Sequence, residues 1–126
     1  MKVVLLAQTQ TKEKMVSKLE FVRDLKFEYG SASQVTPLIR RVIAPNPSAF
    51  TFHGTGTYII GRGKVAVIDP GPLIDSHVDA LLSSIANEIV THILITHTHN
   101  DHSPAAAPFK AATGAPTYGY GPHTPG

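Results

Sequence analysis

The chain has 126 residues, of which 42% are hydrophobic and 16% are charged. This length and composition suit one soluble globular domain with a single core, not two domains. The chain contains no cysteine. Disulfides and thiolate-bound zinc are therefore excluded, and a metal site must be built from histidine, carboxylate or water.

The formal net charge of +2 is unevenly distributed along the chain. Residues 1–41 hold eight basic and four acidic residues, whereas residues 42–126 hold three and five. Such a basic part suits an anionic partner such as single-stranded RNA, although lysines on a solvated helix are the commoner explanation. Neither a signal peptide nor a run of about 20 apolar residues is recognisable, so we expect a cytoplasmic protein without a membrane partner.

Residues 1–43 are predicted to form an N-terminal extension made of a helix and a loop. Apolar residues recur at helical spacing within residues 11–26, which favours a short amphipathic helix. Met15, which lies in this stretch, is an alternative candidate for the natural start. Glycine and prolines interrupt residues 29–48, and this stretch is expected to be loop-like.

Residues 44–126 are predicted to form a domain in which strands and helices alternate. The stretches 51–61 and 64–71 flank a glycine-rich turn and indicate a β-hairpin. Residues 73–86 align apolar side chains on one helical face, and residues 91–96 resemble a buried strand. This order indicates an α/β (α+β) layered domain.

A second helix is predicted over residues 103–113, followed by a short strand over residues 116–120. Ser103 is a good N-cap, Pro104 suits the first helical position, and Gly114 suits the C-terminal stop. Pro108 is expected to strain the middle of this helix.

Three histidines and one aspartate crowd into six positions after the strand predicted at 91–96: His97, His99, Asp101 and His102. His97 and His99 are two residues apart, so an extended backbone directs both to the same side. Neutral imidazole is a good zinc ligand, and a bend after the strand brings the other two side chains near. Four potential ligands so close together indicate two metal positions.

The alternative is that these residues are structural. A single histidine after a strand is usually exposed or hydrogen-bonded, and Asp101 can act as an acid near the start of a helix. This alternative accounts for one or two of the four residues. It does not account for all four at the carboxyl end of a buried strand, where α/β sheets commonly place ligands.

The pattern His-x-His-x-Asp-His at residues 97–102 resembles the signature of the metallo-β-lactamase superfamily. The strand and Asp-Pro-Gly turn at 65–71 support this resemblance, which covers roughly residues 50–120. It implies an αβ/βα sandwich fold and a hydrolase in which a zinc-bound hydroxide attacks an ester, amide or phosphodiester. The sequence of residues 44–61 and 113–123 looks most like the beta-lactamase-like-protein-2 branch of this superfamily. Some hydrolases of that branch cleave single-stranded RNA.

Carried over by position, the resemblance implies two zinc ions. His97 and His99 would bind the first ion, and Asp101 and His102 the second. Asp101 would also orient the attacking group, which makes it the candidate catalytic residue. The resemblance places Asp69 near the metals as a hydrogen-bonding partner of a ligand, while its alternative role is that of a turn residue before Pro70.

The chain is expected to supply only part of such a site. A catalytic zinc usually has three protein ligands, and no aspartate or glutamate follows His102. We therefore expect the N-terminal half of the sandwich, inactive or nearly so alone, with a missing C-terminal half or a homodimer completing it. The alternatives are a metal-binding module that dimerises and a protein that binds or cleaves single-stranded RNA; substrates are a small molecule or RNA.

The remaining histidines carry weaker expectations. His77 and His92 are expected to be structural or exposed. His53 is a candidate for the pocket rim, and His123 is a candidate third ligand whose Gly-Pro setting favours a loop.

Overall fold

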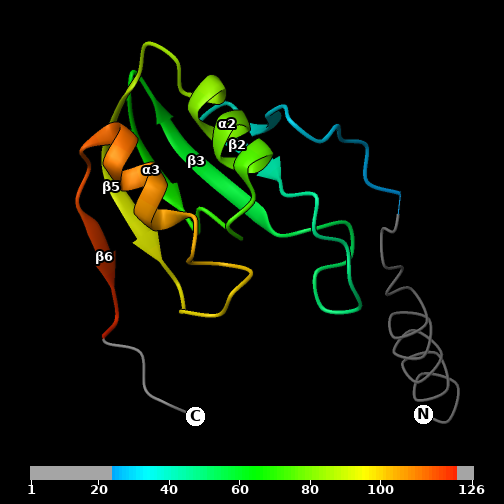
Figure 1. Ribbon diagram of the computed structural model, residues 1–126. Helices are drawn as coiled ribbons and strands as arrows, with labels where there is room; N and C mark the ends of the chain where they lie inside the picture. Colours follow the sequence, from blue (N-terminus) through cyan, green and yellow to red (C-terminus); the bar gives the residue numbers. More distant parts are fainter. Residues whose placement is uncertain (1–23, 122–126) are drawn as a thin grey trace, which may run out of the picture.

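A computed structural model describes residues 24–121, which form one six-stranded sheet with two helices (Figure 1). The strands are β1 (Ser33–Thr36), β2 (Ile39–Ile43), β3 (Gly56–Arg62), β4 (Lys64–Ile68), β5 (Ile89–Ile95) and β6 (Thr117–Gly119). They lie side by side in sequence order. Neighbours are antiparallel from β1 to β4 and parallel from β4 to β6. The expected α/β character is thus confirmed.

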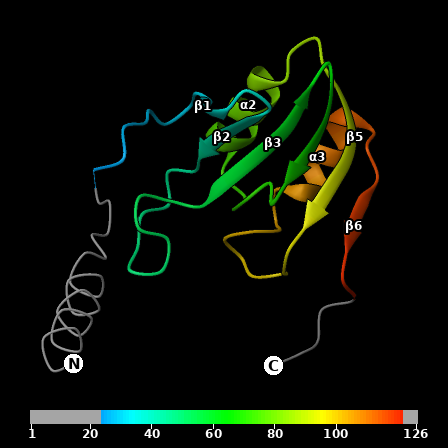
Figure 2. The ribbon, with the colours of Figure 1, turned by 180° about the vertical axis from the view of Figure 1, so that it is seen from behind.

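The helices α2 (Asp75–Ser84) and α3 (Ala106–Thr113) connect the parallel strands. Both lie on the same face of the sheet, as the two opposite views show (Figures 1 and 2). Neither helix of residues 24–121 is long and apolar enough to cross a membrane. The helix expected over residues 11–26 lies almost entirely outside the described residues.

The core fills the space between the sheet and the helices. In the central hairpin, Thr57 and Ile59 of β3 and Val65 and Val67 of β4 are buried and alternate with more exposed residues, as the period of two requires. The most deeply buried members of this core are Val42, Ile59, Val65, Val67, Leu81, Ile93 and Phe109. This packing fixes the positions of β4 and β5, whose carboxyl ends carry the candidate site.

The opposite face of the sheet is not covered by a helix of the described chain. Tyr58 and Ile60 point to this face from β3, and each is 37% exposed. Their partners across the hairpin are Ile68 and Ala66. The chain thus builds one layer of helices on one sheet, and the second face of the sheet carries exposed apolar side chains.

The prediction of a loop over residues 29–48 is wrong for two segments, which are the strands β1 and β2. β1 and β2 form an antiparallel pair, and β2 is registered along its whole length with β3. Arg40 stabilises β2 by donating to the Ser84 carbonyl at the end of α2 and by pairing with Glu88 at 2.9 Å. The division at residue 43 stays a prediction, but the sheet runs across it.

The β3–β4 hairpin is confirmed, although β3 begins at Gly56 and not near residue 51. The start of α3 is also later than expected. Ala105 is the N-cap, with no side-chain cap bond, so Ser103 does not cap the helix. Pro108 consequently lies in the first turn, where backbone N–H groups have no partner within the helix, and causes no break.

Gly114 ends α3 as expected, in the left-handed conformation with φ 72°. We expect Gly114→Ala to lower the free energy of unfolding by about 1 kcal/mol, because alanine is strained at this φ. Urea unfolding followed by circular dichroism measures the loss. The control is Gly121→Ala: this glycine also has open space around it, but its φ is not in the left-handed region. An equal loss in both variants would contradict the assignment.

Candidate metal site

The site begins where the parallel strands β4 and β5 end next to each other. Asp69 follows β4 directly, and Thr96 and His97 follow β5. The Asp69 N–H donates to the Leu94 carbonyl at 2.8 Å, so the two strand ends are tied together. Residues far apart in sequence therefore meet at this edge of the sheet, as expected for an α/β domain.

Asp69 provides a buried carboxylate between the two strand ends. Its side chain accepts the Thr96 N–H at 2.8 Å and the Thr96 hydroxyl at 2.5 Å. The Nδ1 atom of His102 lies 3.0 Å from the same carboxylate. Asp69 is only 6% exposed and has a positive φ of 51°. It is thus both a turn residue and a hydrogen-bonding partner of the cluster, which combines the two roles considered from the sequence.

These bonds determine which ring nitrogens carry protons. A carboxylate can only accept, so Nδ1 of His102 donates to Asp69. The Thr96 hydroxyl donates its only proton to Asp69. Its oxygen therefore accepts a hydrogen bond from Nδ1 of His97 at 2.9 Å. These bonds occupy Nδ1 of each ring and leave Nε2 as the nitrogen that can serve as a ligand atom. Nε2 of His102 lies 3.3 Å from a carboxylate oxygen of Asp101, so these two potential ligand atoms are neighbours.

Gly71 anchors the loop that carries the histidines. Its N–H donates to the His102 carbonyl at 2.9 Å, and its carbonyl accepts the Ala105 N–H at 3.0 Å. Within the loop, the N–H groups of His102 and Ser103 both donate to the His99 carbonyl. The Asp-Pro-Gly turn after β4 therefore holds the histidine loop through its backbone. The turn was recognisable in the sequence, but its contact with the histidine loop was not predicted.

The predicted ligands come together in two overlapping groups. Asp69, His97 and His102 form one group, and His97, His99 and Asp101 form the other. Within each group the potential ligand atoms lie within 4.8 Å of one another. The assignment of His97 and His99 to one ion, and of Asp101 and His102 to a second, stays a prediction. His97 belongs to both groups and therefore links them.

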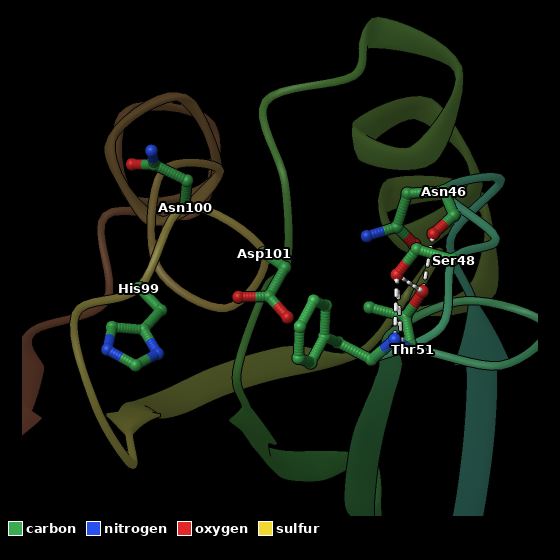
Figure 3. A pocket seen from close by; sticks show the side chains of 7 residues that line it. Asn46, Ser48, Thr51, His99, Asn100 and Asp101 are labelled. Carbon is green, nitrogen blue, oxygen red and sulfur yellow. Dashed lines mark hydrogen bonds between the residues drawn. The ribbon is translucent and has the colours of Figure 1, made fainter.

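A pocket of about 580 Å³ adjoins the second group. His99, Asn100 and Asp101 line one side, and Asn46, Ser48 and Thr51 line the other (Figure 3). The last three belong to the segment between β2 and β3, from which only His53 was expected at the pocket rim. Sequence spacing offers no signal for this contact, because it depends on β2 pairing with β3.

The segment opposite the histidines is braced by its own hydrogen bonds. The Asn46 side chain accepts the Thr55 N–H at 2.9 Å and donates to the Thr55 hydroxyl at 3.0 Å. The Thr51 hydroxyl donates to the Asn46 carbonyl at 2.6 Å. Phe50 lies at the exposed end of this segment, 98% exposed, and lines the pocket. The pocket thus combines polar groups with one exposed aromatic ring.

The other histidines of residues 24–121 lie apart from the cluster. His53 does not line the pocket: its ring lies against Phe27 and Phe52. His92 is exposed on β5 with its ring 5.2 Å from that of Tyr118. His77 is buried, with 1% exposed, and burial lowers its pKa while the Pro70 carbonyl acts in the opposite direction. His123 lies outside the described residues.

Known proteins share this arrangement of sequence and fold. Residues 50–125 match the model of the Metallo-beta-lactamase superfamily. The atrochrysone carboxyl ACP thioesterase of Claviceps purpurea (strain 20.1) is 40% identical over 80 residues, 60% of this chain and 26% of that protein. The corresponding thioesterase of Aspergillus terreus (strain NIH 2624 / FGSC A1156) is 33% identical over 95 residues, 70% of this chain and 30% of that protein.

Two solved structures share the fold at low sequence identity. A beta-lactamase domain protein from Burkholderia ambifaria superimposes with a TM-score of 0.59 at 18% identity, covering 76% of this chain and 33% of that chain. A metallo-beta-lactamase from Cronobacter sakazakii, a HARLDQ motif mutant, gives 0.53 at 19% identity, covering 69% and 33%. The chain belongs to the metallo-β-lactamase superfamily, a hydrolase family, and forms part of its sandwich. It spans under a third of the length of the two thioesterases, and the narrower branch stays a prediction.

Proposed function

We propose that this chain contributes His97, His99, Asp101 and His102 to the metal site of a zinc-dependent hydrolase. The observation that carries the proposal is the pair of overlapping donor groups at the carboxyl ends of β4 and β5. Imidazole nitrogens and carboxylate oxygens are ligands that zinc takes readily. The hydrogen bonds of Asp69 support this use, because they occupy Nδ1 of His97 and His102 and leave the Nε2 atoms as potential ligands, with Nε2 of His102 beside the Asp101 carboxylate.

Zinc bound to a catalytic site lowers the pKa of its water to about 7 and polarises the bond under attack. The chain's own residues would orient the reactants. Asp101 belongs to one donor group and lines the pocket, so its carboxylate is placed to accept a proton from an attacking water. The Asn46 and Thr51 side chains face it across the pocket and offer polar contacts to a substrate (Figure 3).

An ester, amide or phosphodiester fits this chemistry, and a thioester is the first substrate class to test. Two of the relatives are named as thioesterases that act on a carboxyl ACP substrate. Phe50 at the pocket supports an acyl substrate, because an exposed aromatic ring can cover apolar chain. RNA as a substrate stays a prediction.

Metal binding by the 126-residue chain tests the proposal. We expect the purified chain to bind zinc at neutral pH in competition with a chromophoric chelator. Ala substitutions at His97 and His99 should both weaken binding, and His97→Ala should weaken it more because His97 belongs to both donor groups. His92→Ala is the matched control, since His92 is an exposed histidine outside both groups. An absence of bound zinc, or equal binding by the wild type and both cluster variants, would contradict the proposal.

A metal-binding module that dimerises is the second candidate function. The uncovered face of the sheet, with Tyr58 and Ile60, favours it, because exposed apolar patches often mark interfaces. Sedimentation with and without zinc separates the two candidates when combined with a thioester hydrolysis assay. A zinc-dependent dimer without turnover supports the module, and turnover that is lost in Asp101→Asn supports the hydrolase.

A further inference from the structure

A buried chain of hydrogen bonds lies behind the metal site and connects it to helix α2. His77 of α2 and Thr57 of β3 are 1% and 0% exposed. Nε2 of His77 lies 3.1 Å from the Thr57 hydroxyl oxygen. The same hydroxyl lies 2.7 Å from the backbone carbonyl of Asp69. The chain thus ends on the residue whose side chain orders His97 and His102.

The direction of these bonds follows from the number of protons. The Asp69 carbonyl can only accept, so the single proton of the Thr57 hydroxyl points to it. The hydroxyl oxygen must then accept from Nε2–H of His77. Nδ1 of His77 then carries no proton and has no hydrogen-bond partner within residues 24–121, while the Pro70 carbonyl also interacts with the ring. Burial lowers the pKa of His77, which keeps the ring in this neutral form.

The His77 ring also contacts the anchor of the histidine loop. A Cβ atom at Gly71 would lie 3.0 Å from Nε2 and 3.2 Å from Cδ2 of His77. Gly71 is the residue whose N–H and carbonyl hold His102 and Ala105. His77 therefore supports the site at two points: the Asp69 backbone through Thr57, and the Gly71 backbone by direct packing.

A buried polar ring with an unpartnered nitrogen lowers the stability of the fold, so packing alone does not account for a histidine at this position. An apolar side chain of similar size would fill the same space without leaving Nδ1 unpartnered. The donated bond has a second use. Asp69 has a φ of 51°, in the left-handed region that aspartate adopts more readily than most residues, and the bond through Thr57 holds its carbonyl in this conformation.

We propose that His77 is a positioning residue for the metal site, acting through the Thr57 hydroxyl on the Asp69 backbone and through packing on Gly71. This inference rests on the proposed metal site. In the wild type, the rigid Asp69 carboxylate keeps Nε2 of His97 and His102 aimed at one ion. Without the bond from His77, the Thr57 hydroxyl is free to turn away, and Asp69 loses the constraint on its backbone.

Cobalt binding tests the inference, because Co²⁺ reports both affinity and ligand geometry through its visible absorption. The 126-residue chain would be compared with His77→Leu, His77→Gln and Thr57→Val, with urea unfolding measured on each. We expect His77→Leu and Thr57→Val each to weaken Co²⁺ binding about 10-fold or more, as is typical when a partner of a ligand is removed. His77→Gln should retain more affinity, since its amide nitrogen can replace Nε2–H as the donor.

The double variant His77→Leu/Thr57→Val separates positioning from stability. Because His77 and Thr57 share one chain of bonds, the loss of Co²⁺ affinity in the double variant should be smaller than the sum of the two single losses. Any loss beyond that of Thr57→Val reports the packing of His77 on Gly71. His92→Leu, on the exposed part of β5, is the control and should bind like the wild type. If His77→Leu does not fold, the comparison of His77→Gln with Thr57→Val decides.

The outcomes distinguish this inference from the proposed function. A wild-type chain that binds no Co²⁺ or zinc overturns the metal site itself. A wild type that binds metal, with variants that lose stability but keep its affinity and spectrum, overturns the role of His77 alone. Additive losses in the double variant would also overturn it.

Discussion

Gly71→Ala is expected to lower the free energy of unfolding by about 2 to 5 kcal/mol and to weaken metal binding in the variant that still folds. Two costs combine at this position. Gly71 has a φ of 92°, which strains any L side chain, and the new Cβ would lie 3.0 Å from the buried ring of His77. The ring or the turn must move by a few tenths of an ångström, which strains the bond from His77 to Thr57 and the hydrogen bond by which Gly71 holds His102.

Gly63→Ala separates the two costs. Gly63 has a comparable φ of 75°, but nothing lies within 4 Å of a Cβ added there. Alanine at Gly63 should therefore show only the backbone penalty, about 1 kcal/mol, and should leave metal binding unchanged. Urea unfolding and zinc titration on both variants provide the measurement. Equal effects of the two substitutions would show that the contact between Gly71 and His77 is unimportant.

Asp69→Ala is the second substitution with a large expected effect. It removes the acceptor of the Thr96 N–H, the Thr96 hydroxyl and His102 Nδ1. We expect a loss of about 2 to 4 kcal/mol in the free energy of unfolding, because partly buried donors lose a charged partner. Metal affinity should fall as well, since the rings of His97 and His102 are no longer fixed in the tautomers that leave Nε2 free.

Asp69→Asn distinguishes the charge from the shape of this side chain. Asparagine tolerates the positive φ of residue 69, and its oxygen can still accept the Thr96 N–H. Its NH₂ group cannot accept from the Thr96 hydroxyl or from His102. We therefore expect a smaller loss of stability than in Asp69→Ala but a clear loss of zinc affinity. Asp75→Asn, at an exposed carboxylate in the first turn of α2, is the control. Wild-type zinc affinity in Asp69→Asn would contradict the role assigned to the carboxylate.

Local sequence patterns predicted most of the regular structure in residues 51–121. The β3–β4 hairpin follows from alternating side chains and a glycine turn, and α2 and β5 follow from their apolar periodicity. β1 and β2 were missed because prolines and glycine surround short strands whose pairing partners lie elsewhere in the chain. The late start of α3 was missed because the chain between His99 and Ala105 is held by bonds to Gly71 and not by a side-chain cap.

The sequence by itself determined which potential ligands gather at one place, because residues that are adjacent in the chain must also be close in space. His97, His99, Asp101 and His102 were recognisable for that reason. The tertiary structure decided what surrounds them: Asp69 reaches Thr96 and His102 only because β4 and β5 are parallel neighbours. His77 supports Asp69 only because α2 packs over β3. Contacts of this kind depend on strand order and helix packing, and these arise from the summed burial of many side chains rather than from any short motif.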